Sequence, residues 1–123
     1  MSEVMSWDIP EASSYWGLIR SRAELTPDAP MLIEPSGRRT SFVEYAVMAE
    51  RLAAALYGQG IRAGSWVTWQ FPTGRAAALL IGALARLAAV QNPIIHLYRE
   101  REVSTVLRQS GSSFFIVPQH IGD

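Results

Sequence analysis

Residues 65–93 constrain the fold of this chain more than any other stretch, because they combine a strand pattern, a long apolar helix pattern and a second strand pattern. The run that starts at Trp66 is rich in aromatic and β-branched residues and ends at Pro72, where the hydrogen-bond ladder of a sheet cannot continue. A second apolar run starts at Val90. A strand, a helix and a strand of this length predict two parallel strands joined by a right-handed crossover.

The apolar segment between these two strands, residues 76–90, is interrupted only by Gly82 and Arg86. It is too long for one strand and is rich in alanine and leucine, so it predicts a helix that is buried on most sides. We expect Thr73 to cap the start of this helix and Gly74 to allow a tight entry. A membrane span is not expected, because a bilayer requires about 20 apolar residues and Arg86 would lie inside it.

The composition excludes several classes of function. With 123 residues, the chain is one domain or part of one. Its net charge is zero and all eleven basic residues are arginine, so no block of basic charge is available to bind a nucleic-acid backbone. The absence of cysteine excludes disulfides, thiolate metal sites and a cysteine nucleophile. The sequence shows no signal-peptide pattern and no transmembrane segment, so a cytoplasmic protein is expected.

The residues before the first strand predict a short helix, a hairpin and a second helix. Residues 1–13 show no periodicity and predict a flexible arm, and a helical pattern starts at Ser14. A turn of Pro, Ser and Gly at residues 35–37 lies between two short runs and favours a β-hairpin. Ser41 and Glu44 have the spacing of a capping box, and the apolar residues that follow repeat at helical intervals. A capped amphipathic helix is therefore predicted.

The residues after the second strand predict one more helix and one more strand. The charged run at residues 99–102 is interpreted as the solvated first turn of a helix that ends at Gly111, and residues 114–117 predict a third strand. The predicted fold class is therefore α/β, with an incomplete doubly wound parallel sheet of strand, helix, strand, helix and strand from about residue 66. A helix, a β-hairpin and the capped amphipathic helix precede this sheet.

Ligands of an open parallel sheet bind where the strands end, at their carboxyl edge. The candidate binding segments are therefore residues 71–74, 95–98 and 117–120. They contain no carboxylate pair for acid and base catalysis, no nucleophile beside a base and too few further ligands for a metal ion. No catalytic residue and no metal ligand is therefore assigned. The polar side chains in or beside these segments are Thr73, Arg75, His96, Tyr98, Arg99, Gln119 and His120.

The order of several short motifs points to a known family. The motifs are LTPDAP at residues 25–30, RTSF at 39–42, EY at 44–45, GIRAG at 60–64, FP at 71–72, AAVQNP at 88–93, EV at 102–103 and SG at 110–111. With these motifs, the chain resembles the N-terminal part of the AMP-forming acyl-CoA synthetases, within the acyl-adenylate-forming superfamily that also contains luciferases and adenylation domains. The chain departs from the family pattern at Ser65, Thr73 and Ala88, where Asp, Asn and Gly are usual.

The resemblance implies an enzyme that activates a carboxylic acid with ATP and Mg²⁺, releases pyrophosphate and transfers the acyl group from AMP to the thiol of coenzyme A. Residues 14–123 would then be the N-terminal fragment of the large AMP-binding domain. The phosphate-binding loop and the adenylating lysine of the family lie further downstream, and this sequence contains no lysine. The fragment alone is therefore expected to be inactive and to bind neither ATP, Mg²⁺ nor coenzyme A tightly.

One ligand contact carries over from the resemblance. In acetyl-CoA synthetase-like members, the loop after the second strand contacts the adenine nucleotide of coenzyme A. That loop aligns with Ile95, His96 and Leu97, beside Tyr98, and bulky residues here replace a glycine-rich loop. The same segment lies at the predicted carboxyl edge of the sheet, so these four residues are the predicted cofactor-binding site.

Two other functions remain open from the residues alone. A stand-alone flavodoxin-like nucleotide-binding module would have the same class of sheet, although three parallel strands are few for that fold. A short interaction protein could instead dimerise through the exposed face of an unfinished sheet. A fragment of a larger enzyme would also self-associate through exposed apolar surface. The carboxylic acid is not predicted, since the acyl pocket of the resembling family is built mostly from later residues.

Overall fold

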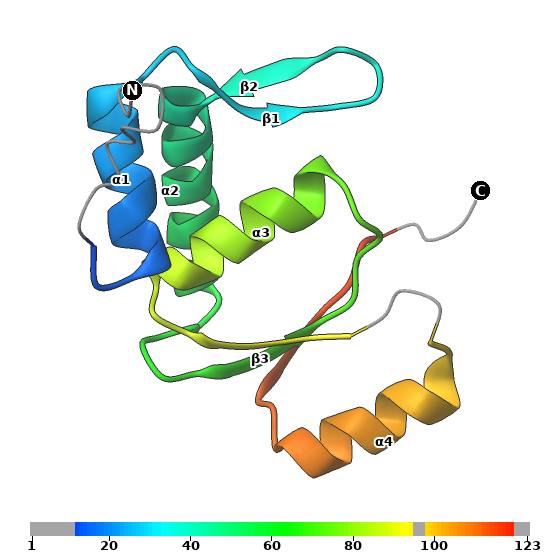
Figure 1. The fold of residues 1–123 in the computed structure, drawn as a ribbon. Coiled ribbons are helices and arrows are strands. Elements are labelled where there is room, and N and C mark those ends of the chain that lie inside the picture. The colour runs from blue at the N-terminus through cyan, green and yellow to red at the C-terminus, as the bar shows by residue number, and fades with distance from the viewer. Residues whose placement is uncertain (1–11, 95–97, 120–123) are drawn as a thin grey trace, which may run out of the picture.

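The computed structural model describes residues 12–94 and 98–119. The helices and strands are, in chain order, α1 (Tyr15–Leu25), β1 (Pro30–Ile33), β2 (Arg39–Ser41), α2 (Phe42–Gly58), β3 (Trp66–Trp69), α3 (Arg75–Arg86), β4 (Val90–Pro93), α4 (Glu100–Ser110) and β5 (Phe114–Ile116). The predicted α/β class is confirmed, because β3, β4 and β5 form a parallel sheet, and β1 and β2 form the expected antiparallel hairpin (Figure 1).

The parallel sheet has the order β4-β3-β5, so β3 lies in the middle. Val67 is paired with Gln91 of β4 and with Phe114 of β5. Because side chains alternate between the two faces of a strand, Val67 and Trp69 pack in the apolar cluster that includes residues of α3, while Thr68 points to the opposite face. The strand, helix and strand predicted around residues 65–93 are therefore present and parallel.

Helix α3 lies between the sheet and the pair of helices α1 and α2 (Figure 1). Leu80 and Leu84 pack with Val67 of the central strand in one apolar cluster. Residues on the other side of α3, such as Leu79, pack in a second cluster around Tyr45 of α2 and residues of α1. This double packing explains why the segment is apolar almost throughout, and it confirms that the helix is buried on most sides.

The start and the end of α3 differ from the prediction. The N-terminal cap is Gly74, not Thr73, and no side chain accepts a capping hydrogen bond there. Since the helix begins at Arg75, Thr73 lies one residue too early for its hydroxyl to reach the first amides. The backbone of Gly74 is extended, so no tight entry of the kind that only glycine allows is needed. At the other end the helix stops at Arg86, and the last apolar residues of the run form a turn and enter β4.

The capping box at the start of α2 is confirmed. The backbone N–H of Glu44 donates to Ser41 Oγ at 3.1 Å, and the backbone N–H of Ser41 donates to Glu44 Oε1 at 2.8 Å. Helix α1 is capped in a similar way, because Gly17 N donates to Ser14 Oγ at 3.0 Å. Both helix starts were predictable because these partners are local in sequence.

The capping box predicts a pH dependence of stability. The hydrogen bond from the Ser41 amide, followed by the one from its side chain, lowers the pKa of Glu44 below its ordinary value. Since the folded pKa is the lower one, the stabilising contribution of this carboxylate is present above the unfolded pKa and is lost as the pH falls through the folded pKa. We expect the stability difference between the wild type and Glu44→Gln to shrink as the pH falls from 7 to 3 in urea unfolding. A stability difference that stays constant from pH 7 to pH 3 would contradict this contribution of the Glu44 carboxylate.

Ala88 adopts a left-handed backbone conformation, with φ of 59°, in the turn between α3 and β4. Alanine is strained in this conformation because its Cβ approaches the following carbonyl group. We therefore expect Ala88→Gly to stabilise the fold by up to about 1 kcal/mol, after the entropy cost of glycine is subtracted.

A matched control for this turn is Ala54→Gly, which places glycine at an exposed position inside α2. It should destabilise by about 1 kcal/mol, because glycine is a poor helix former. Urea unfolding of the two variants checks that their changes in the free energy of unfolding have opposite signs. A destabilising Ala88→Gly substitution would show that Ala88 is not strained at this turn.

Candidate functional site

The carboxyl ends of β3, β4 and β5 lie at one edge of the sheet because the strands are parallel. The three strands end on the same side of the sheet, on the right in Figure 1. This edge is where the sequence analysis placed the candidate binding segments. It is therefore the candidate functional site, and each predicted residue can be located relative to it.

The structure places only some of the predicted residues at this edge. Ile95, His96, Leu97 and His120 lie outside the described residues, so their assignment stays a prediction. Tyr98 lies just before α4, with 36% of its surface exposed. Of the remaining polar residues, those with exposed side chains are Thr73, Arg99 and Gln119.

Arg75 is not directed into the candidate site. Its Nε donates to Thr40 Oγ1 at 3.4 Å, and an Nη atom donates to Met48 Sδ at 3.0 Å. The same Nε lies 3.8 Å from Glu34 Oε2, which also lies 3.7 Å from Nε of Arg38. This guanidinium group therefore connects the start of α3 to the hairpin and to α2, which is a structural role.

Gln70 is the residue that the sequence analysis missed. It directly follows β3, and only 5% of it is exposed. Its side-chain Nε2 donates to the carbonyl oxygen of Tyr98 at 2.9 Å, and its backbone N–H donates to the carbonyl of Ile116 at 3.0 Å. Buried polar side chains need such partners. A glutamine at the end of an aromatic strand was the available signal in the sequence.

A second set of polar contacts lies on the same face of the sheet, further from the carboxyl edge. Asn92 Nδ2 donates to Thr68 Oγ1 at 3.1 Å, and Thr68 Oγ1 shares a short hydrogen bond with Ser112 Oγ. Ser112 Oγ also lies 3.0 Å from Ser110 Oγ. Thr68 is fully buried, so these contacts satisfy its hydroxyl and connect the end of α4 to the central strand.

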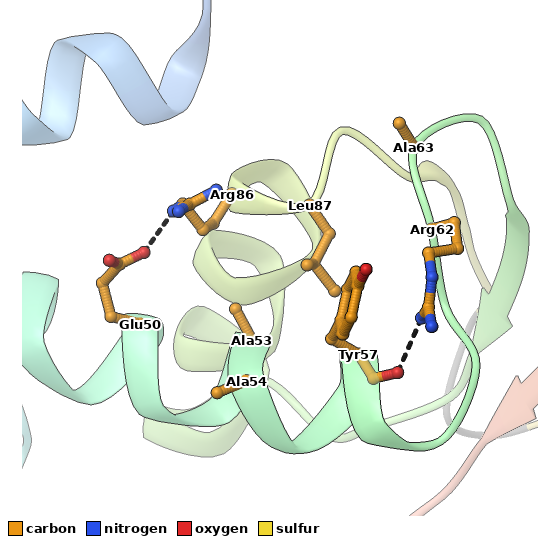
Figure 2. A pocket seen from close by; sticks show the side chains of 8 residues that line it. All are labelled: Glu50, Ala53, Ala54, Tyr57, Arg62, Ala63, Arg86 and Leu87. Carbon is orange, nitrogen blue, oxygen red and sulfur yellow. Dashed lines mark hydrogen bonds and ion pairs between the residues drawn. The ribbon is translucent and has the colours of Figure 1, made fainter.

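A hollow in the described surface lies elsewhere. A groove of about 680 Å³ runs between the C-terminal half of α2, the loop before β3 and the end of α3. Glu50 and Arg86 form an ion pair across it, and the guanidinium of Arg62 lies 3.5 Å from the ring centre of Tyr57 (Figure 2). The residues that line it are Glu50, Ala53, Ala54, Tyr57, Arg62, Ala63, Arg86 and Leu87.

This groove does not coincide with the candidate site. It is formed next to the amino ends of β3 and β4, since Ala63 precedes one strand and Leu87 precedes the other. Parallel sheets bind their ligands at the opposite end. Its Arg62 side chain already donates to the carbonyl of Tyr57 at 2.6 Å. The charged groups of this groove therefore serve the packing of α2 against α3 and the loop before β3.

The described part of the candidate site offers groups for hydrogen bonding and apolar contact, together with the exposed Arg99. Within residues 12–94 and 98–119, no group of three or more histidine, cysteine, aspartate or glutamate residues is placed to hold a metal ion. In the same part of the chain, no helix combines the length and the apolar character needed to cross a bilayer. This edge can position a ligand or a neighbouring segment.

Comparison with known proteins places this fold in a family. Residues 19–123 match the family described as AMP-binding enzyme. Long-chain-fatty-acid–CoA ligase FadD13 of Mycobacterium tuberculosis is 32% identical over 100 residues, which cover 80% of this chain and 20% of the ligase. HC-toxin synthetase of Cochliobolus carbonum is 26% identical over 122 residues, which cover 95% of this chain and 2% of the synthetase.

A solved structure agrees with these matches. The N-terminal domain of FACL13 from Mycobacterium tuberculosis, crystallised with a bound inhibitor, superposes with a TM-score of 0.80 at 30% sequence identity, covering 86% of this chain and 27% of that one. The chain thus spans only a minor part of the proteins that it matches. Since the family match extends over nearly the whole sequence and the fold agrees with it, the chain belongs to the AMP-binding, acyl-adenylate-forming family, as its N-terminal portion.

Proposed function

We propose that this chain is the N-terminal part of an ATP-dependent carboxylic acid:CoA ligase. The complete enzyme would use ATP and Mg²⁺ to form an acyl-adenylate and pyrophosphate. It would then transfer the acyl group to the thiol of coenzyme A and release AMP. The observation that carries this proposal is the continuous family match over residues 19–123, together with the identity to a long-chain-fatty-acid–CoA ligase.

The reaction is tested with the enzyme encoded by the complete reading frame that contains this sequence. Incubation with ATP, Mg²⁺, coenzyme A and a panel of fatty and aromatic acids should produce an acyl-CoA thioester that mass spectrometry identifies. The formation of AMP should match the formation of the thioester. If no acid in the panel yields AMP, the proposal is wrong.

The chain alone is predicted to be inactive. Its 123 residues contain no lysine, whereas the adenylating residue of the family is a lysine. Arg75, which follows β3, is turned towards Glu34 and Thr40 and so is not directed at a nucleoside triphosphate. Purified chain should form no AMP above background under conditions in which the complete enzyme is active. Turnover by the chain alone would contradict this prediction.

The predicted contact with coenzyme A also belongs to this proposal. It consists of Ile95, His96, Leu97 and Tyr98, of which the structure describes the last, at the carboxyl edge of the sheet. Replacing His96 and Leu97 with alanine in the complete enzyme should raise the KM for coenzyme A and leave the KM for ATP unchanged. An unchanged KM for coenzyme A would remove this segment from the binding site.

The similarity to HC-toxin synthetase favours a second candidate function. In this case the complete protein would form an acyl-adenylate but would deliver the acyl group to an acceptor other than coenzyme A. The two candidates share the first half-reaction and differ in the second. Adenylate formation without any coenzyme A-dependent thioester would favour this second function over the ligase.

A further inference from the structure

We propose that an exposed apolar patch on the parallel sheet is the docking surface for a helix that follows residue 123 in the complete enzyme. The patch consists of Trp66 on β3, Phe115 on β5 and Val117 just after β5, and it is called the β5 patch. The inference rests on the proposed function, because only a complete ligase supplies the further residues. It identifies the surface through which this portion packs against the rest of the AMP-binding domain.

The β5 patch lies on the face of the sheet opposite α3. Val67 packs on the α3 side, so Trp66 and Thr68 on either side of it face the other way. Phe115 is paired with Thr68 and therefore shares its face, and Val117 continues the alternation two residues later. The exposed fractions are 47% for Trp66, 39% for Phe115 and 41% for Val117. Three large apolar side chains on one face of the sheet are therefore open to solvent.

Helix α4 covers only part of this face. It lies on the opposite side of the sheet from α3 (Figure 1), and Ser112, just after its end, shares a hydrogen bond with the fully buried Thr68. The cover thus reaches the middle of β3 and leaves Trp66 and Phe115 partly exposed. Parallel sheets occur almost only with both faces covered. Within residues 12–94 and 98–119 the β5 patch departs from this rule, which indicates that a further element covers it.

The handedness of the crossovers determines which element fits the β5 patch. The path from β4 through α4 to β5 crosses the sheet from one outer strand to the other, and a right-handed crossover places its helix on the face opposite α3. A further right-handed crossover from β5 to a strand beyond it would run in the same direction and place its helix on the same face. A strand added beyond β4 would instead place its helix on the face that α3 covers. The β5 patch therefore favours a new strand next to β5.

The helix of such a crossover would pass directly over the β5 patch. It would leave β5 at the carboxyl edge of the sheet and return to the amino edge, where the next parallel strand begins. Val117 and Phe115 lie in this order along that path, and Trp66 lies at the amino end of the neighbouring strand. A helix that buries one side on a sheet carries apolar residues at intervals of three and four. The expected occupant is therefore an amphipathic helix of the same polypeptide.

A second copy of this chain fits the β5 patch less well. The chain covers 27% of the N-terminal domain of FACL13, so a related domain contains several times as many residues that pack together with this portion. Two copies could also pair through the outer edges of their β5 strands. Such a dimer would extend the sheet and would leave its face, with the β5 patch, uncovered.

Hydroxyl-radical footprinting of the complete enzyme, read by mass spectrometry, tests whether the β5 patch is covered. The oxidation rate of each residue is compared with that of the same residue in a proteolytic digest, where all side chains are exposed. Trp66 and Phe115 should be protected by about tenfold or more, as residues on a covered face of a parallel sheet. Tyr57 is the matched control, because it is 51% exposed on α2, on the side of α3 away from the sheet, so its protection should stay at about twofold. Oxidation of Trp66 as rapid as that of Tyr57 would overturn the inference.

Photochemical cross-linking in the complete enzyme identifies the occupant. With Phe115→p-benzoylphenylalanine, irradiation should join position 115 to a peptide that follows residue 123 in the same polypeptide, so a denaturing gel should show a single-chain band. The same substitution at Tyr57 should give no such link. A cross-link between two polypeptides would show that a second copy covers the β5 patch. A cross-link confined to residues 1–123 would show that no later helix does, and either result would overturn the inference.

Enzyme activity separates this inference from the proposed function. If Trp66 is unprotected while acid-dependent ATP–pyrophosphate exchange persists, the docking surface is wrong and the ligase remains. If no acid supports exchange, the proposed function is wrong. The cross-link from position 115 then still decides whether the β5 patch is an internal surface of the complete protein.

Discussion

Replacing Gly82 with alanine is expected to destabilise the fold by about 2 kcal/mol. A Cβ atom at this position would lie 2.4 Å from Oη and 2.9 Å from Cζ of Tyr45, far closer than van der Waals contact. Tyr45 is fully buried, and its Oη donates to the carbonyl of Ala78 at 2.6 Å. Overpacking and the loss of this hydrogen bond each cost about 1–2 kcal/mol, of which the higher helix propensity of alanine offsets about 1 kcal/mol.

The hydroxyl of Tyr45 stays protonated, so displacing its ring would break a hydrogen bond that it donates. Burial, followed by the hydrogen bond with Tyr15, raises the pKa of the Tyr45 hydroxyl well above its ordinary value. The phenol therefore stays protonated and can donate to the Ala78 carbonyl at any pH at which the protein is handled. Displacing the ring by an added methyl group would leave this donor buried and without its partner, which is costly.

Urea unfolding of Gly82→Ala and Gly58→Ala checks the expected loss of stability. Gly58 ends α2, and an added Cβ would meet no atom within 4 Å, so its replacement should be neutral or slightly stabilising. Removing the Tyr45 hydroxyl in the double variant Gly82→Ala/Tyr45→Phe should recover part of the lost stability, since the two sites are in contact. Equal unfolding midpoints for the two glycine variants would show that α3 does not pack against Tyr45 as described.

Replacing Leu84 with alanine is expected to destabilise the fold by about 3 kcal/mol. Leu84 has no exposed surface and packs on α3 against Val67 and Trp69 of the central strand. Removing its side chain leaves a cavity between helix and sheet, and such cavities in a close-packed core cost about 2–5 kcal/mol. The effect should appear as a lower urea midpoint of the whole chain, because this cluster joins α3 to the parallel sheet.

Ile81→Ala is the matched control for the core substitution. Ile81 lies on the same helix, but 36% of it is exposed, so its truncation should cost less than about 1 kcal/mol. A loss of similar size in both variants would mean that α3 does not present Leu84 to the sheet. A much smaller effect of Leu84→Ala than expected would mean that the surrounding core collapses into the cavity.

The parts of the fold that depend on local patterns were predictable from the sequence. The capping box of Ser41 and Glu44 needs only two residues at a fixed spacing. The parallel strand, helix and strand around residues 65–93 follow from the length and the composition of one stretch. Gly111 ends α4 in a left-handed conformation, as a glycine after a helical pattern predicts.

Features decided by contacts between distant residues could not be predicted. The close approach of Gly82 to Tyr45 joins two helices, and nothing in either local sequence indicates it. The incorrect assignment of Thr73 as a cap has a different cause, because the helix begins at Arg75 and its cap is therefore Gly74, the residue after Thr73. Such boundaries depend on small differences in local energy.

The candidate site likewise combines a feature that follows from the sequence pattern with features that depend on contacts between distant residues. The common carboxyl edge of the three strands was predictable, because parallel strands end at the same edge of a sheet, and the ligand expected there stays a prediction. Gln70 was not predicted, since its role depends on the carbonyl of Tyr98 being brought within reach by the fold. The groove beside Arg62 and Arg86 has no sequence signature either, because residues of α2, of α3 and of the loop before β3 form it together. Its position at the amino ends of the strands separates it from the site.

The measurement that tests the central claim most directly is ATP–pyrophosphate exchange by the enzyme encoded by the complete reading frame. We predict that exchange requires a carboxylic acid and Mg²⁺ and proceeds without coenzyme A, because adenylate formation comes before transfer to the thiol. We also predict that the 123-residue chain alone catalyses no exchange. The absence of acid-dependent exchange in the complete protein, with a broad panel of carboxylic acids, would contradict the claim.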